Sequence, residues 1–192
     1  DVHGPWKYQG LRDHYALFNA NDCLLHAETG TDGCCDVASM TRFAAREKLW
    51  PPDKANRLWC HHAAWWIMGD AIAALFGDLG GIDAFVKASQ AMQAESLRYA
   101  VESNRRRKFQ CAGTLIWQMN EPWPNLSCTS NIDYYGRCKP AFYAATRAFA
   151  PLHLSLRHEG LVLTPGAEFV GEAFLHHRGI GAGGSCVTWR VV

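Results

Sequence analysis

The chain has 192 residues, of which 48% are hydrophobic and 12% aromatic, so it can bury a core and is not disordered. The formal net charge of +1 gives no sign of an obligatory nucleic-acid or membrane partner, and the sequence has no run of about 18 apolar residues. It opens on Asp1 and polar residues instead of Met and a signal peptide, so we expect a piece of a longer chain, of undetermined compartment.

Cysteine usage gives no sign of a metal or cofactor site. The eight cysteines include no C-x-x-C pair, and no Cys/His spacing fits a zinc site. We therefore expect mostly buried free thiols that fill small spaces in the core. His61 and His62, beside Cys60, are expected to be structural, and the prediction is no metal and no cofactor.

The first part of the chain predicts a short strand flanked by helices. Residues 10–19 carry apolar side chains on one helical face, and residues 23–26 form a brief apolar run of strand type. That run leads into a polar, glycine-containing loop at 27–33, which carries a carboxylate near its start. Helices are expected at 36–48 and 53–77, and the aromatic residues of the second are expected to belong to the core.

A long helix and a second strand follow. Residues 83–108 have an approximately helical apolar face, with Asp83 as the N-cap candidate and a basic run at the carboxyl end. The strand expected at 113–119 is rich in β-branched and aromatic residues and must end before Pro122, because proline cannot donate to a sheet. A further helix is expected at 140–150.

The alternation of strand, carboxylate-bearing loop and helix predicts parallel strands joined by helical crossovers, an α/β fold. Two such units cannot close a sheet by themselves. Residues 1–151 are therefore interpreted as the C-terminal portion of a larger (β/α)8 TIM barrel, in which functional groups lie at the carboxyl ends of the strands.

Pro151 marks a change of pattern to short alternating strands separated by turn residues. These strands are expected at 152–157, 161–163, 168–175 and 186–192. This spacing is typical of the opening of a β-sandwich, and about forty residues cannot complete one. Residues 152–192 are therefore interpreted as the start of a second, incomplete domain.

Polar and aromatic residues gather where the strand at 113–119 ends. The segment Gly113–Pro124 places amides and a carboxylate between two indoles: Trp117, Gln118, Asn120, Glu121 and Trp123. Indole faces stack on the apolar faces of sugar rings, while amides and carboxylates bond hydroxyl groups, so the segment fits the floor of a sugar site. An equally good interpretation is a core strand that runs into a proline turn whose polar residues face water.

These residues carry a resemblance to a known family. Trp117–Pro124, followed by Ile132–Arg137, resembles the last barrel strand of glycoside hydrolase family 2, in its β-mannosidase-like branch. His26–Gly30 resembles the family's Ser-Glu-Phe-Gly motif, which carries the catalytic nucleophile on the seventh strand. Ala27 and Thr29 depart from that motif. The resemblance covers most of residues 1–151, and the remaining residues are similar to the start of the family's next, immunoglobulin-like domain.

The resemblance implies a retaining exo-β-glycoside hydrolase, with β-mannosides as the favoured substrates and β-galactosides next. It assigns Glu28 as the nucleophile that forms a glycosyl-enzyme intermediate. The expected substrate-binding residues are Trp117, Gln118, Asn120, Glu121 and Trp123. The family's acid/base lies on an earlier strand, so residues 1–192 are expected to be inactive without the rest of the parent chain.

Other residues are given lesser roles. Asp133, Tyr134 and Arg137 are expected to brace the loop after the strand. His3 and Trp6 precede the strand of Glu28 and are considered for the rim of the site, without an assigned role. Two other functions stay open: a carbohydrate-binding module without chemistry, and an inert piece with open sheet edges. For the hydrolase and for the carbohydrate-binding module, the expected partner is a carbohydrate. No nucleic-acid or membrane partner is expected.

Overall fold

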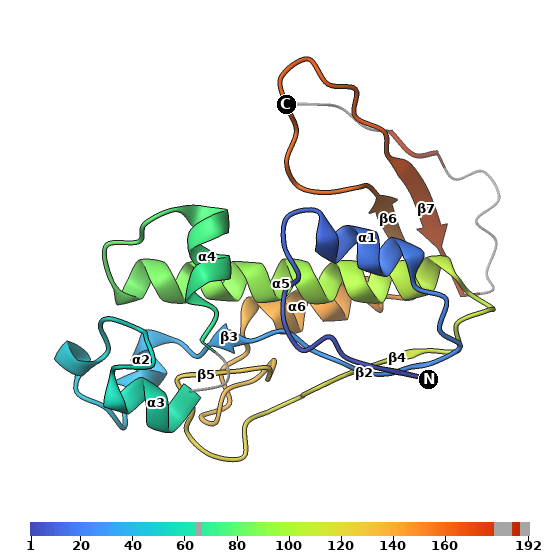
Figure 1. Cartoon of the computed structure of the whole chain (residues 1–192). Coiled ribbons are helices and arrows are strands. Elements are labelled where there is room, and N and C mark those ends of the chain that lie inside the picture. Colours follow the sequence, from blue (N-terminus) through green and yellow to red (C-terminus); the bar gives the residue numbers. More distant parts are fainter. Residues whose placement is uncertain (64–66, 179–185, 189–192) are drawn as a thin grey trace.

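Helix α5 (Ile82–Arg106) runs along most of the molecule, and the other elements are arranged around it in the computed structural model of the chain (Figure 1). The structure describes residues 1–63, 67–178 and 186–188. Buried positions recur along α5 at helical spacing, from Phe85 through Met92 to Tyr99. The long amphipathic helix predicted for 83–108 is confirmed.

The cap of α5 differs from the prediction. Gly81 is the N-cap residue, and Asp83 lies within the first helical turn, where its carboxylate pairs with Arg46 of the 3-10 helix η1 (Arg46–Lys48). A carboxylate in the first turn still faces the positive end of the helix dipole. An ion pair with a segment distant in sequence therefore takes the place of the expected capping bond.

Three short strands form a parallel sheet in the order β1 (Val2–His3), β2 (His26–Thr29), β4 (Thr114–Ile116). Helix α1 (Asp13–Ala20) lies in the connection of β1 to β2, and α5 lies in the connection of β2 to β4. The prediction of parallel strands with helical crossovers is confirmed for β2 and β4. The two residues of β1 are too few to show a periodicity, so the sequence does not predict this strand.

Both predicted strands differ from the expected bounds. Strand β2 begins at His26 instead of residue 23, because the Asn21 side-chain oxygen accepts a hydrogen bond from the Cys23 N–H and holds that segment in a turn. Strand β4 covers only 114–116 of the predicted 113–119. Beyond it, the Trp117 N–H still donates to the Thr29 carbonyl at 2.8 Å, so the carboxyl ends of the two strands meet.

The helix predicted at 36–48 is divided in the structure. It consists of α2 (Val37–Met40) and η1, separated by a turn. The ring of Phe43 in this turn packs on His62, with 5.1 Å between ring centroids. A tertiary contact thus outweighs a helix propensity that is weak in any single residue.

The helix predicted at 53–77 is also divided, into α3 (Arg57–Ala63) and α4 (Gly69–Phe76), and residues 64–66 lie outside the described part. The start of α3 has a local cause. The side-chain oxygen of Asn56 accepts a hydrogen bond from the Leu58 N–H at 3.1 Å, as an N-cap residue does.

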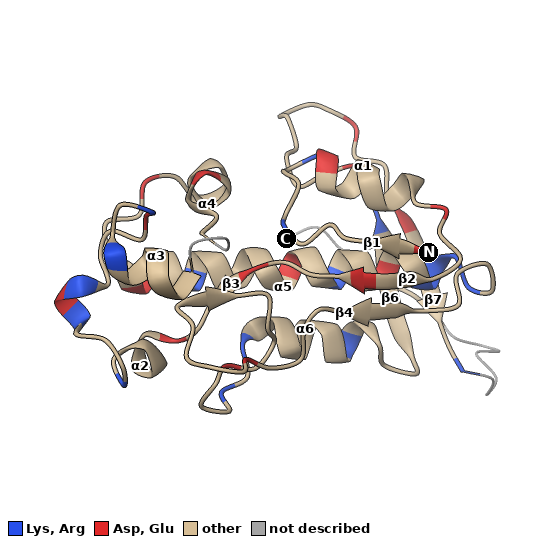
Figure 2. Ribbon diagram, turned by 60° about the horizontal axis from the view of Figure 1, so that its bottom comes forward, with Lys and Arg blue, Asp and Glu red and all other residues tan. Residues whose placement is uncertain are grey.

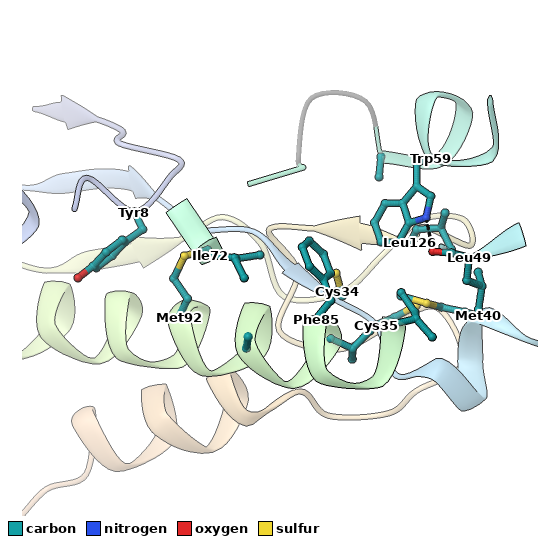
Figure 3. Close-up of a cluster of buried hydrophobic side chains, with 14 of the residues drawn as sticks. Tyr8, Cys34, Cys35, Met40, Leu49, Trp59, Ile72, Phe85, Met92 and Leu126 are labelled. Atoms are coloured by element: carbon teal, nitrogen blue, oxygen red, sulfur yellow. Dashed lines mark hydrogen bonds between the residues drawn. The ribbon is translucent and has the colours of Figure 1, made fainter. Parts of the chain in front are cut away.

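The main hydrophobic core lies along α5 and includes residues of α1, α3 and α4, and Figure 3 shows part of it. Trp59 of α3 is fully buried there, and its indole N–H donates to the Leu49 carbonyl at 2.9 Å. The core assignment of the aromatic residues is confirmed for Trp59 and is wrong for Phe76, which is exposed. Trp65 and Trp66 lie outside the described residues.

Most of the cysteines are buried free thiols, as predicted. The buried ones are Cys23, Cys34, Cys35, Cys111 and Cys128. Burial raises the pKa of the Cys34 thiol to about 11 and raises that of Cys35 as well. Since the thiolate is the reactive form, these two adjacent cysteines have a packing role.

Two antiparallel pairs complete the structure. Strands β3 (Gly33–Cys34) and β5 (Ser127–Cys128) pair beside α5, and β6 (His153–Arg157) pairs with β7 (Glu172–His176). The strand predicted at 161–163 is absent from this described segment, because the Leu161 N–H donates instead to the loop before α1. Residues 186–188 are not in a strand, and 189–192 lie outside the described part.

Charged residues of both signs are spread along the chain (Figure 2). The basic run that ends α5 is used inside the protein: Arg105 donates to the Ala148 and Ala150 carbonyls at the end of α6 (Pro140–Ala148). Arg106 lies over the Tyr99 ring, 4.9 Å from its centroid. Among the described helices, none has the length and hydropathy needed to cross a membrane.

Candidate functional site

Glu28 lies at the carboxyl end of β2, with a quarter of its side chain (25%) exposed. The Trp6 indole N–H donates to its Oε1 at 2.6 Å, and the His3 Nδ1 lies 4.0 Å from its Oε2. These two residues are in and just after β1, the neighbouring strand. The Glu28 carboxylate is therefore partly accessible and is also held by the Trp6 indole.

The loop that carries Trp6 is fastened to the end of β2 by main-chain bonds. The Gly4 N–H donates to the Glu28 carbonyl at 2.6 Å, and the Gly30 N–H donates to the Pro5 carbonyl at 3.0 Å. The Thr29 hydroxyl donates to the same Pro5 carbonyl at 3.2 Å. Thr29, which departs from the family motif, thus has a structural use here.

His26 fixes the opposite side of this loop. Its Nε2 donates to the Gly4 carbonyl at 2.6 Å, and its Nδ1 accepts a hydrogen bond from Asn104 of α5 at 3.1 Å; these partners assign the proton to Nε2. Burial lowers the pKa of His26, so the ring is neutral at pH 7. The Asn104 amide also donates to Thr114 of β4 at 2.9 Å, so one pair of side chains ties together β1, β2, β4 and α5.

Gly30 lets the ends of β2 and β4 meet. A Cβ atom at this position would overlap the main-chain carbonyl oxygen of Trp117. Because this neighbour is backbone, it cannot give way as a flexible side chain would. The glycine of the Glu-Thr-Gly motif is therefore required by the approach of the two strands.

We expect Gly30→Ala to lower the free energy of unfolding by about 1–3 kcal/mol, the usual range for overpacking. Urea denaturation of the chain measures this. Gly113→Ala is the matched control at the start of β4, since a Cβ there would meet only the Leu25 side chain at an ordinary 3.7 Å. Equal stability of the two variants would contradict the steric argument.

The predicted sugar-binding residues do not all face the same way. Trp117 is 45% exposed at the strand end beside Gly30, and Asn120 is exposed as well. The Gln118 amide points to the Cys128 sulfur, at 3.4 Å. Trp123 is 60% exposed, and its indole N–H donates to Asn125 within its own loop at 2.9 Å. Only Trp117 is brought next to the end of β2 by main-chain bonds.

Glu121 is the clearest departure from the prediction. Its side chain is 1% exposed, and one of its oxygens lies 3.1 Å from the ammonium group of Lys139, which is equally buried. Ser130 donates to the same oxygen at 2.6 Å, and the Tyr134 N–H donates to the other at 3.2 Å. A carboxylate enclosed in this way holds its own loop and does not contact a sugar.

The bracing role predicted after the strand is confirmed for Asp133. Its Oδ1 accepts hydrogen bonds from the N–H groups of Tyr135 and Arg137, both at 2.9 Å, and its Oδ2 accepts one from Ser39 at 2.6 Å. The Arg137 side chain lies 3.7 Å from Asp36. Sequence reasoning considered Trp6 and His3 only for the rim of the site, because their contact with Glu28 depends on strand pairing across more than twenty residues.

Chemically, the site offers one accessible carboxylate, an indole donor to it, and an exposed indole on the next strand. Such a group can act as a nucleophile or bind hydroxyl groups. No group of three or more His, Cys, Asp or Glu side chains in the described ranges is arranged to hold a metal ion.

No protein-family model matches the chain, but its sequence is similar to those of curated β-mannosidases. β-Mannosidase B of Aspergillus flavus is 36% identical over 165 residues, which are 83% of this chain and 19% of that protein. β-Mannosidase B of Emericella nidulans is 27% identical over the same shares. The chain thus spans about a fifth of the length of these curated relatives.

Solved structures agree in fold. The β-D-mannosidase of Dictyoglomus thermophilum has a TM-score of 0.70 and 22% identity, over 92% of this chain and 25% of that one. The exo-chitosanase of Amycolatopsis orientalis has a TM-score of 0.63 and 22% identity, over 83% of this chain and 20% of that one. At this identity the likeness concerns the fold alone.

Proposed function

We propose that the chain is part of an exo-β-glycoside hydrolase of family 2 that acts on β-mannosides, because its sequence is similar to a segment of the β-mannosidases described above. We propose a retaining mechanism with Glu28 as the nucleophile. The observation that carries this proposal is the position of Glu28: accessible, at the carboxyl end of a parallel strand, with the Trp6 indole on its Oε1.

The proposed architecture follows from the open sheet. Residues 1–151 would be the C-terminal part of a TIM barrel, because three parallel strands with helical connections have two unpaired edges. Beside β4, the exposed side chains of Leu115, Met119 and Phe149 line an apolar groove of about 460 Å³. A further strand and helix of a barrel would cover this face. Residues 152–192 would begin an immunoglobulin-like β-sandwich, of which β6 and β7 are one pair.

In the proposed reaction, the ionised Glu28 attacks the anomeric carbon while a carboxylic acid protonates the leaving oxygen. Water then hydrolyses the glycosyl-enzyme, and the second group acts as base. That group must stand ~5–5.5 Å from the nucleophile in a retaining enzyme. Glu121 is unsuited to this role, because Lys139 and Ser130 enclose it. We assign the acid/base to the part of a full-length enzyme that lies outside residues 1–192.

Covalent trapping tests this proposal. The longest expressible protein that contains these residues is treated with a 2-fluoro-β-mannoside bearing a good leaving group, and the labelled peptide is found by mass spectrometry. Label on Glu28 is the expected result, and label on Glu121 would reverse the assignment. Label with the galactoside analogue alone would favour a β-galactosidase. If neither labels but sugar still binds, the exposed indoles of Trp117 and Trp123 favour a carbohydrate-binding role.

Trp6 has a positioning role in this proposal, because its N–H stabilises the charged carboxylate of Glu28. We expect Trp6→Phe to lower kcat/KM about 10–100-fold, as the loss of a hydrogen bond to a charged group does. Trp50→Phe is the control, since that exposed indole follows η1 and lies outside the site described above. Steady-state kinetics with an aryl β-mannoside measures both variants, and an equal loss in the two would contradict the role of Trp6.

A further inference from the structure

Gly4 lies between β1 and the loop that carries Trp6, and the Trp6 ring rests on it. The φ angle of Gly4 is +84°, in the left-handed region that favours glycine. A Cβ atom at this position would stand 3.0 Å from Cζ3 and 3.1 Å from Cε3 of the Trp6 indole, closer than such contacts normally are. The indole is therefore packed directly against the main chain of Gly4, and a movement of Gly4 would move the ring.

Both polar main-chain groups of Gly4 are held by β2. The Gly4 N–H donates to the Glu28 carbonyl at 2.6 Å, and the Gly4 carbonyl accepts a hydrogen bond from the His26 Nε2, also at 2.6 Å. The indole N–H of Trp6 in turn donates to the Glu28 carboxylate at 2.6 Å. A closed series of contacts thus leads from His26 through Gly4 and Trp6 to the Glu28 side chain.

The proton that His26 gives to Gly4 is fixed from the other side of the ring. The Asn21 amide donates to the Asn104 Oδ1 at 3.1 Å, which turns the NH₂ group of Asn104 toward the His26 Nδ1, 3.1 Å away. Since Nδ1 accepts, the proton of the neutral ring lies on Nε2 and faces Gly4. His26 is 1% exposed, so water does not compete for this bond.

We propose that His26 is a positioning residue for Glu28, and that it acts through Gly4 by keeping the Trp6 indole N–H on the carboxylate. The proposal rests on the proposed glycosidase function, in which Glu28 is the nucleophile. Trp6 bonds the carboxylate directly, whereas His26 reaches it through the main chain of Gly4. His26 therefore matters for activity only as long as Trp6 is able to donate.

A double-mutant cycle tests this dependence, with kcat/KM for an aryl β-mannoside measured in the longest expressible protein that contains these residues. We expect His26→Leu to lower kcat/KM about 10-fold or more when Trp6 is present. In the Trp6→Phe background the same change should lower it less than about 3-fold, because the hydrogen bond that His26 maintains is already lost. His26→Gln should recover most of the activity, since its amide still donates toward Gly4.

The indole N–H signal of Trp6 reports on the same arrangement without turnover. It is observed by NMR in the ¹⁵N-labelled chain and assigned by its loss in Trp6→Phe. A hydrogen bond to a carboxylate is short and strong, so this proton resonates downfield, and Glu28→Gln should move it upfield. We expect His26→Leu to move the signal in the same direction and His26→Gln to leave it near its wild-type position.

A pair of glycine variants tests the step from Gly4 to the indole. Gly10 also has a positive φ, +123°, but a Cβ atom there would meet nothing within 4 Å. Gly4→Ala and Gly10→Ala therefore both strain the backbone, and only the first pushes against the Trp6 ring. We expect Gly4→Ala to move the Trp6 signal and lower kcat/KM, and Gly10→Ala to leave the signal in place.

The neutral state of His26 gives a pH dependence of definite sign. Burial lowers its pKa below the ordinary 6.5, the Gly4 carbonyl opposes this, and His3 of β1 adds to it. Its other neighbours are the carboxylate of Glu28 on β2 and the uncharged Asn104, Thr114 and Phe18. Below pH 6.5 the unfolded chain binds a proton that the folded chain resists, so stability is full above this pH and falls below it. Urea unfolding should show the wild type losing stability relative to His26→Gln in that range, since the other histidines titrate in both proteins.

Equal losses from His26→Leu with and without Trp6 would overturn the proposal, and so would a Trp6 signal that His26→Leu does not move. His158→Leu is the control for the loss of a buried histidine, since it follows β6 and its Nδ1 lies 3.0 Å from the Gly160 carbonyl. A Trp6 signal that moves equally in this control would also count against His26. Label on Glu28 with equal losses would refute the role of His26 and keep the glycosidase. A signal that moves only in His26→Leu, without label on Glu28, would support the positioning of the indole and refute the nucleophile.

Discussion

Glu28→Gly is expected to lower the rate of aryl β-mannoside hydrolysis by ~10⁴-fold or more, because it removes the catalytic nucleophile. The rate is measured in the longest expressible protein that contains these residues. Azide is then expected to restore turnover. The space left by the side chain admits the small anion to the face of the sugar that Glu28 would attack. Azide displaces the phenolate there in a single inversion, so the product from a β-mannoside is the α-mannosyl azide.

The stereochemistry of this product tests the role as well as the residue. A β-mannosyl azide would mean that Glu28 is the acid/base instead, because the true nucleophile would still form the glycosyl-enzyme and azide would replace water in the second step. Glu47→Gly serves as the control, since that carboxylate lies on η1. Unchanged hydrolysis in Glu28→Gly would refute the nucleophile.

The second large effect concerns the buried pair of Glu121 and Lys139. We expect Glu121→Ala or Lys139→Met to lower the free energy of unfolding by about 3–5 kcal/mol, because each leaves an uncompensated buried charge. Lys139 also donates to the carbonyls of Gly33 at 2.7 Å and Cys128 at 3.3 Å, and to the Ser130 hydroxyl at 2.9 Å. It thus joins the loop after β4 to both strands of the β3–β5 pair.

A double-mutant cycle completes this test, with urea unfolding as the measurement. The apolar double variant, Glu121→Leu with Lys139→Met, should recover much of the stability lost in the single variants, since neither charge is then left alone. If Glu121→Ala unfolds like the wild type but loses affinity for mannobiose, the structural role is wrong. Glu121 would then return to the sugar-binding residues.

The elements with long or strong patterns were predictable. Helix α5 shows a helical period over 25 residues, and α6 begins at Pro140, a residue favoured in the first turn. The strand before Trp117 could be recognised from its apolar run and the prolines beyond it. The parallel pairing of β2 with β4 followed from the helix between them, since a parallel connection needs a crossover.

The side-chain directions in the site were not predictable, and Glu121 is the main example. In the sequence it stands beside Trp117 and Trp123 and is as polar as any surface residue. Its burial depends on Lys139, eighteen positions further along, folding back to meet it. The residues near Glu121 in the sequence do not indicate such a partner. A charge can be buried only where the tertiary structure supplies the opposite charge.

The sequence by itself determined the periodic helices, the order of strand and crossover, and the motif that puts Glu28 at a strand end. These depend on contacts within a few residues, which composition and spacing record. Only the tertiary structure decided that Trp6 bonds Glu28 and that Lys139 and Ser130 enclose Glu121. Both depend on which distant segments meet, because a polar group is tolerated inside a protein only where the fold supplies its partner.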